Sequence, residues 1–182
     1  MAITRLNNNS ITSVTALPSA IPTGKVLQVK QTYVDTISSQ SISIGTWTPI
    51  TDLEVSITPS SASSKILIFV EWNGESGENY PHNNTFGIQR NSTDIGLQTG
   101  IGSRQPGITS MNVNHTANAD STPESAVYNF LDSPATTSAI TYKACIWCQN
   151  AQTLYNNRTV NASDTLDYER LTSSITVMEI AG

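Results

Sequence analysis

The chain has 182 residues, enough for one domain with its own core, and only 13% of them are charged, about half of the usual quarter. Its net charge of −5 and its nine dispersed Lys and Arg residues argue against binding to a nucleic-acid backbone, which needs clustered basic side chains. No window of about 18 apolar residues predicts a membrane-spanning helix, and the start of the chain lacks the pattern of a secretory signal peptide.

The first segment, residues 1–24, is predicted to be an extended arm that becomes ordered only on a partner. It contains Pro18, Pro22 and Gly24 with many Ser, Thr and Asn residues, and it shows no helical period. Its large aliphatic residues make it less polar than a linker should be. We expect these side chains to bind a partner: Ile3, Leu6, Ile11, Val14, Leu17 and Ile21. A flexible leader that binds nothing is the alternative.

The rest of the chain, residues 25–182, has the period of two that is typical of β-strands. One face of the first predicted strand carries Leu27, Val29 and Tyr33. Residues 52–58 alternate between apolar and polar, which predicts a half-buried strand. Residues 65–72 form a nearly continuous apolar run, which predicts a strand buried on both faces. The short Pro- and Ser-rich segment between these two strands predicts that they pair as an antiparallel hairpin.

Further strands are predicted at regular spacing, with turns at Asn73-Gly74, Arg90-Asn91-Ser92 and Asn156-Asn157. They cover residues 85–90, 93–98, 108–113, 125–132, 140–149, 152–158 and 173–180. No stretch keeps a 3.6-residue period, so the chain is predicted to be all-β. Roughly nine or ten strands favour an antiparallel jelly-roll β-sandwich, residues 25–182, behind the extended N-terminal arm. The last strand is expected to lie inside a sheet.

The two cysteines, Cys145 and Cys148, form a C-x-x-C pair within one predicted strand. Residues three apart on a strand point to opposite faces, so these thiols are poorly placed to form a disulfide. A redox pair normally lies at a helix N-terminus, and a zinc site needs about four ligands. We therefore expect two ordinary buried thiols, which is compatible with a cytoplasmic origin.

Acidic and histidine residues lie in predicted loops, where solvated charge is a better explanation than a calcium site or a glycosidase pair of carboxylates. The histidines lie near no recognised nucleophile, and the chain contains no G-x-S-x-G motif. These residues are Glu71, Glu75 and Glu78, then Asp164 and Asp167, and the histidines His82 and His115.

Three tryptophans, Trp47, Trp72 and Trp147, lie in different predicted strands. They could form a platform for sugars, but we expect them to fill a core or a seam between subunits. A carbohydrate-binding or glycan-cleaving site would best use Glu71 beside Trp72, yet alternation puts these two side chains on opposite faces. No catalytic constellation is found. The sequence therefore predicts a structural or binding protein, not an enzyme, with no metal and no cofactor.

Several stretches together resemble a known group of proteins. They are ITRLNNNSITSVTALP, WTPITDLEVSITPSSASSKILIFVEW, GIQRNSTDIG, YNFLDSPATTSAITYKA and SSITVMEI. The combination is similar to small structural proteins of tailed bacteriophages, especially those that infect aquatic bacteria, and the resemblance covers nearly the whole chain. It implies a jelly roll of the C1q or tumour-necrosis-factor type and a homotrimer. It also implies a place on the virion, as a fibre tip, a receptor-binding head or a capsid decoration.

The short length of the chain helps to choose between a fibre and a capsid location. A fibre needs a shaft, and the chain contains no heptad, collagen-like or β-helix repeat. A compact head on a short arm favours a trimeric capsid decoration or cement protein, whose arms clamp neighbouring major capsid subunits. We expect it on the outer surface of the virion after assembly in the host cytoplasm. The alternative is a tail-fibre or head-fibre tip that binds a receptor or glycan on the host surface.

Overall fold

We describe the protein from a computed structural model, which describes residues 25–77, 83–111 and 121–182. The regular elements in these ranges are β-strands, so the predicted all-β class is confirmed. In chain order they are β1 (Val26–Val34), β2 (Ser38–Ile42), β3 (Thr48–Ile57), β4 (Lys65–Ser76), β5 (Asn84–Arg90), β6 (Thr93–Ile95), β7 (Thr109–Ser110), β8 (Glu124–Asp132), β9 (Ile140–Cys148), β10 (Gln152–Asn156) and β11 (Ser173–Ile180).

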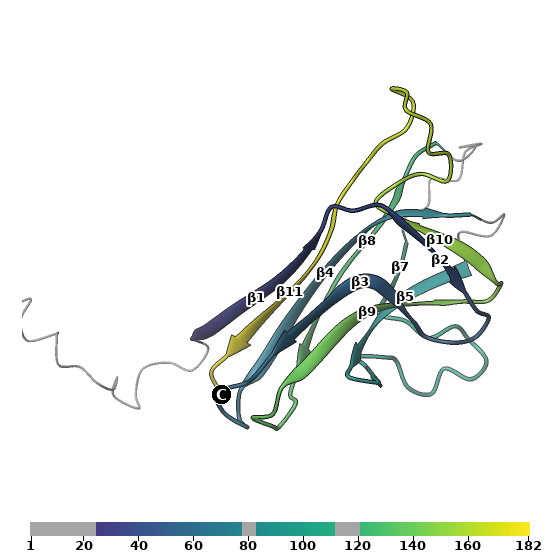
Figure 1. The fold of residues 1–182 in the computed structure, drawn as a ribbon. Coiled ribbons are helices and arrows are strands. Elements are labelled where there is room, and N and C mark those ends of the chain that lie inside the picture. Colours follow the sequence, from purple (N-terminus) through teal and green to yellow (C-terminus); the bar gives the residue numbers. More distant parts are fainter. Residues whose placement is uncertain (1–24, 78–82, 112–120) are drawn as a thin grey trace, which may run out of the picture.

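The strands form two antiparallel sheets that pack face to face as a β-sandwich (Figure 1). Sheet A has the strand order β1-β11-β4-β10-β2, and β8 also pairs with β4. Sheet B has the order β3-β9-β5-β6, and β7 also pairs with β5. The last strand, β11, lies between β1 and β4, which confirms that the C-terminal strand lies inside a sheet.

The core lies between the two sheets, because alternate side chains of each strand point inward. On β4, every second residue from Ile66 to Trp72 is buried. The Trp72 ring packs against Phe86 of β5 with 4.9 Å between the ring centroids, and Tyr128 of β8 lies 6.4 Å from Phe86. These aromatic contacts join sheet A to sheet B.

The predicted hairpin between residues 52–58 and 65–72 is wrong. The first of these strands, β3, pairs with β9 in sheet B, whereas β4 pairs with β8, β10 and β11 in sheet A. Residues 58–64 therefore cross from one sheet to the other. The crossing is held by Glu179 of β11, whose carboxylate accepts hydrogen bonds from the backbone N–H and the hydroxyl of Ser60.

The predicted turn at Asn73-Gly74 is also wrong, because β4 continues through both residues to Ser76. The Asn73 amide donates to the backbone oxygen of Thr172, and its side-chain oxygen accepts from Ser125. At Gly74, a Cβ atom would overlap the backbone oxygen of Tyr155 in β10. The asparagine and the glycine thus serve close packing of the sheet here, not chain reversal.

Other turns and boundaries agree better with the predictions. Asn91 and Asn157 have positive φ angles of 56° and 59° at the expected turns, a conformation that asparagine tolerates better than most residues. The strands predicted at 93–98 and 108–113 are shorter, at Thr93–Ile95 and Thr109–Ser110. Strand β2 was not predicted, because SSQSI offers a single large apolar side chain.

Candidate functional site

The six residues expected to bind a partner lie outside the described part of the chain. These are Ile3, Leu6, Ile11, Val14, Leu17 and Ile21, all within residues 1–24. The described part of the chain begins at Lys25, whose backbone oxygen accepts a hydrogen bond of 2.9 Å from the N–H of Ala181. Lys25 therefore lies beside the C-terminal end of β11.

The cysteine pair is structural. Cys145 and Cys148 are both free and buried in β9. Cys148 packs in the core between the sheets, whereas Cys145 is paired with Gly87 across the strands and is not part of that core cluster. Burial raises the pKa of Cys145 to about 12 and also raises the pKa of Cys148. The expectation of two ordinary buried thiols is confirmed.

The acidic residues are arranged differently from the prediction. Glu71 and Glu75 lie within β4, not in a loop, and Glu75 is buried at 4% exposure. Its carboxylate accepts a hydrogen bond from the backbone N–H of Val160. The expectation of solvated loop charge is therefore wrong for Glu75, because residues 157–172 cover it. Asp164 and Asp167 are exposed in those residues, whereas Glu78, His82 and His115 lie outside the described residues.

A second buried carboxylate was not found from the sequence. Glu124, at the start of β8, is 7% exposed, and its Oε2 atom has no hydrogen-bond partner among the residues that the structure describes. Burial, together with the nearby Glu75 carboxylate, raises its pKa to about 7. The side chain follows a Pro- and Ser-containing stretch that is typical of a loop, and this pattern hid its burial.

The tryptophans divide between core and surface. Trp72 is fully buried, and its indole N–H donates to Asn156 at 2.8 Å, while Trp47 and Trp147 are half-buried. Glu71 is exposed on the opposite face of β4 from Trp72, as alternation predicts. The two side chains therefore do not form a shared sugar site.

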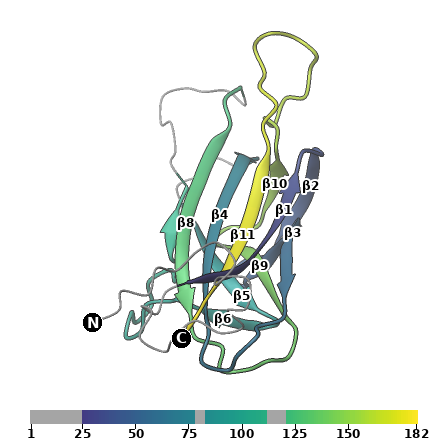
Figure 2. The same cartoon turned by 90° about the vertical axis from the view of Figure 1, so that its left-hand side faces the viewer.

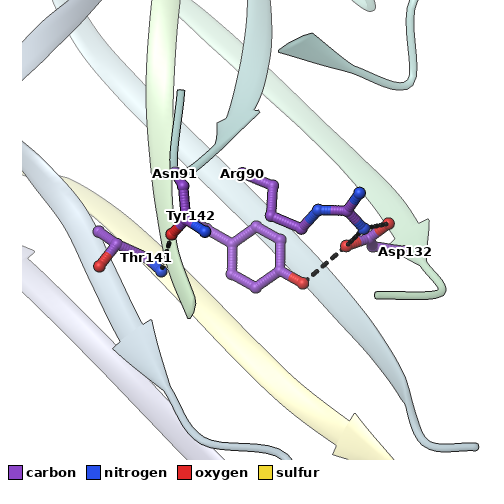
Figure 3. Close-up of polar contacts among 5 residues, drawn as sticks. All are labelled: Arg90, Asn91, Asp132, Thr141 and Tyr142. Atoms are coloured by element: carbon purple, nitrogen blue, oxygen red, sulfur yellow. Dashed lines mark hydrogen bonds and ion pairs between the residues drawn. The ribbon is translucent and has the colours of Figure 1, made fainter. Parts of the chain in front are cut away.

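A polar cluster, Arg90, Asp132 and Tyr142, joins the sheets (Figure 3). Arg90 Nη1 lies 3.0 Å from both carboxylate oxygens of Asp132, and the Tyr142 hydroxyl donates to Asp132 Oδ2 at 2.7 Å. Burial and the hydrogen-bonded Asp132 carboxylate raise the pKa of Tyr142 well above its ordinary value. Beside it, the N–H of Thr141 donates to the side-chain oxygen of Asn91. Both carboxylate oxygens of Asp132 form hydrogen bonds within the sandwich, so the role of the cluster is structural.

Four strands of sheet A, β8, β4, β11 and β1, lie side by side (Figure 2). Their outward-facing side chains include several exposed apolar residues. Leu131, Leu67, Met178 and Val29 are successive cross-strand partners and form one unbroken row. Phe69 lies in the adjoining row. We call this surface the apolar face and define it by Val29, Tyr33, Leu67, Phe69, Val127, Leu131 and Met178.

Much of the apolar face is accessible to solvent. The exposed fraction is 67% for Val127, 60% for Tyr33, 51% for Val29, 46% for Leu131 and 41% for Phe69. The prediction that residues 65–72 are buried on both faces is thus wrong for the single chain. Val29 and Tyr33 do share a face, as predicted, but that face points outward. A contiguous exposed apolar surface on a soluble sandwich typically marks an interaction site.

The outer face of sheet B is different, because its polar side chains are paired with one another. Lys143 lies 3.4 Å from Glu54 across β9 and β3, and the hydroxyls of Ser56 and Thr141 are 2.7 Å apart. On β5 and β6, Gln89 donates to Asp94 at 2.9 Å. A sheet that faces water on one side has this pattern. The contrast makes the apolar face of sheet A the candidate functional site.

Comparison of the chain with protein-family models and with curated proteins found no match. Among the described residues, no three His, Cys, Asp or Glu side chains are grouped so that they could hold a metal ion. In the same part of the chain, no helix is long and apolar enough to cross a membrane. The candidate site therefore depends on the geometry of sheet A alone.

Proposed function

We propose that this protein is a non-enzymatic structural protein of a tailed-bacteriophage virion. It is a homotrimeric capsid decoration or cement protein with a jelly-roll body, and its N-terminal arm, residues 1–24, binds the major capsid protein. The observation that carries this proposal is the apolar face of sheet A, a surface that a protein acting alone in water would not keep exposed. The resemblance of the sequence to phage structural proteins supplies the setting.

The mechanism combines self-association with multivalent attachment. Copies that pack through their bodies hold several arms together, and each arm reaches a different shell subunit. Linked attachments of this kind raise avidity by factors of roughly 10²–10⁴ without any strong single contact. Each aliphatic anchor of the arm contributes on the order of 25 cal/mol per Å² of apolar surface buried. Shell subunits then separate only when arms are peeled away.

The alternative is the tip of a tail fibre or head fibre that binds the host surface. One observation favours it: residues 157–172 project from the end of the sandwich opposite to the start of β1 (Figure 1). Leu166 at this end is fully exposed, with a relative accessibility of 106%. An exposed loop far from the attachment point is well placed to contact a receptor or glycan.

Immunogold labelling of purified virions with an antibody against this chain separates the two placements. Gold particles distributed over the shell support the decoration protein, and gold confined to the tail or to fibres supports the alternative. If neither structure is labelled on intact virions that contain the chain by immunoblot, the proposed exterior location is wrong.

The role of the arm is tested in the full-length chain. Replacing Ile3, Leu6, Ile11, Val14, Leu17 and Ile21 with serine should abolish attachment to particles that lack the wild-type protein. A matched control replaces six hydroxyl residues of the same segment with alanine and should attach normally: Thr4, Ser10, Ser13, Thr15, Ser19 and Thr23. Normal attachment of the serine variant would contradict the arm mechanism.

A further inference from the structure

We propose that the apolar face of sheet A is covered by a second copy of this chain, and that Lys65 of one copy lies against Glu71 of the next. This assignment deepens the proposed function and rests on its homo-oligomer. It names the surface through which the copies pack and the charged residues that set their arrangement.

The outward-facing side of β4 carries both apolar and charged side chains. Leu67 and Phe69 lie between Lys65, the first residue of the strand, and Glu71 on its outward-facing side. Glu71 is opposite Val127 of β8 and is the last exposed outward position of β4. Both charged residues are exposed, and neither forms an ion pair with any residue that the structure describes. They are six residues apart, or roughly 20 Å along an extended strand.

Two neighbouring cross-strand rows of the apolar face carry no charged side chain. The row through Leu67 is apolar on all four strands, from Leu131 to Val29. The row through Phe69 contains only uncharged neighbours, among them Asn129 and Thr176. The centre of the face is therefore free of charge, as the cores of protein interfaces generally are.

The apolar residues and the two charges of this face are complementary to those of another copy. An apolar centre with a cation on one side and an anion on the other matches copies of itself, since neighbouring copies supply the anion for Lys65 and the cation for Glu71. In the proposed homotrimer, a closed head-to-tail ring brings these opposite charges together. Another protein would need both charges at the same spacing, whereas a second copy has them by construction.

The experiment measures the mass of the purified full-length chain by light scattering at micromolar concentration. A multiple of the chain mass of 19.6 kDa is expected. Leu131→Glu places a charge in the apolar row and should weaken association at least about tenfold. The matched control is Leu166→Glu, which makes the same change at a fully exposed leucine away from the face, and it should associate like the wild type.

Charge reversal tests the cross-copy contact. Lys65→Glu and Glu71→Lys should each weaken association, because each brings like charges together, and the double variant should restore it. Circular dichroism of each variant confirms that the sandwich is folded. The four substituted positions are all exposed on the surface of the single chain, so the substitutions do not disturb its core: Lys65, Glu71, Leu131 and Leu166.

Three outcomes would overturn the assignment. The first is a wild-type chain that is monomeric across the micromolar range. The second is Leu131→Glu associating as strongly as Leu166→Glu, and the third is a double charge reversal no better than either single variant. Loss of association in the serine variant of residues 1–24, with Leu131→Glu unaffected, would assign the contact to the arm instead. None of these results depends on particle labelling, so the proposed virion location is judged separately.

Discussion

At the scale of single residues, Asp132 carries the clearest energetic consequence. It accepts from Arg90 and Tyr142 across the sandwich and is 6% exposed. Asp132→Asn keeps the shape but removes the charge, which leaves the Arg90 guanidinium without its counterion in a partly buried site. We expect the free energy of unfolding to fall by about 2–4 kcal/mol, measured as a lower urea midpoint with an unchanged m-value.

The control for this prediction is the exposed ion pair on sheet B. Lys143 lies 3.4 Å from Glu54, and the Glu54 side chain is 53% exposed. Glu54→Gln should therefore cost less than about 1 kcal/mol. If Asp132→Asn were no more destabilising than Glu54→Gln, the cluster in Figure 3 would not hold the two sheets together.

Glu124 makes the stability of the folded protein depend on pH, with the opposite sign to the dependence that a carboxylate in an ion pair produces. Its pKa rises from 4.5 to about 7 because of burial and the nearby Glu75. Between these pH values the folded state keeps a proton that the unfolded state has lost, so stability falls as the pH rises from 4.5 to 7. Glu124→Gln should remove this slope and stabilise the protein at pH 8 by about 2 kcal/mol, since solvent screens part of the effect.

Thermal unfolding from pH 4 to pH 8 measures the slope. Glu169→Gln, at an exposed carboxylate of residues 157–172, is the matched control and should leave the pH profile unchanged. A Glu124→Gln profile that is parallel to the wild-type profile would show that Glu124 has the same pKa in the folded and the unfolded protein.

At the scale of elements, Glu179 ties three segments of the fold together. It is fully buried on β11 and accepts from Gln28 of β1 at 2.6 Å and from Ser60 of the β3–β4 crossing at 2.6 and 2.7 Å. Burial alone would raise its pKa, but the hydrogen bonds from Ser60 and Gln28 outweigh this effect and lower the pKa to about 2. The charged carboxylate is thus the form that the fold requires.

The stability that Glu179 contributes is present above the unfolded pKa of about 4.5 and is lost as the pH falls toward 2. Glu179→Gln should lower stability at pH 7 by about 1–3 kcal/mol, because it replaces charge-assisted hydrogen bonds and brings two amide donors together. Urea unfolding at pH 7 and pH 3 measures both effects. A variant with the wild-type difference in stability between these two pH values would contradict this account.

Sequence patterns predict the strands more reliably than the connections between them. Period two and Asn-containing turns predict most strands, and Asn91 and Asn157 have the positive φ angles that such turns use. Asn73-Gly74 has the same sequence signature but lies inside β4. The Asn73 side chain forms hydrogen bonds with Thr172 and Ser125, and Gly74 leaves room for the backbone of β10. Local chemistry cannot reveal a requirement that a distant segment imposes.

At the scale of the whole molecule, the all-β class follows from the sequence, but the assignment of strands to sheets does not. A seven-residue connection such as residues 58–64 can close a hairpin or cross between sheets, and the choice is made by β9 and β11, far away in the sequence. The candidate site was missed for a related reason. The apolar run of residues 65–72 predicts a strand buried on both faces, but its outer face is exposed in the single chain. An apolar pattern does not say whether the chain itself or another molecule covers such a face.

That cover has a consequence for the whole folding equilibrium. If copies associate through the apolar face, only folded chains associate, so association stabilises the native state by mass action. The midpoint temperature of the wild type should therefore rise with protein concentration, over a range from about 1 to 100 μM. The midpoint of Leu131→Glu should rise less with concentration, because its association is weaker, while Leu166→Glu should follow the wild type. A wild-type midpoint that stays constant over this hundredfold range would mean that the apolar face remains open to water.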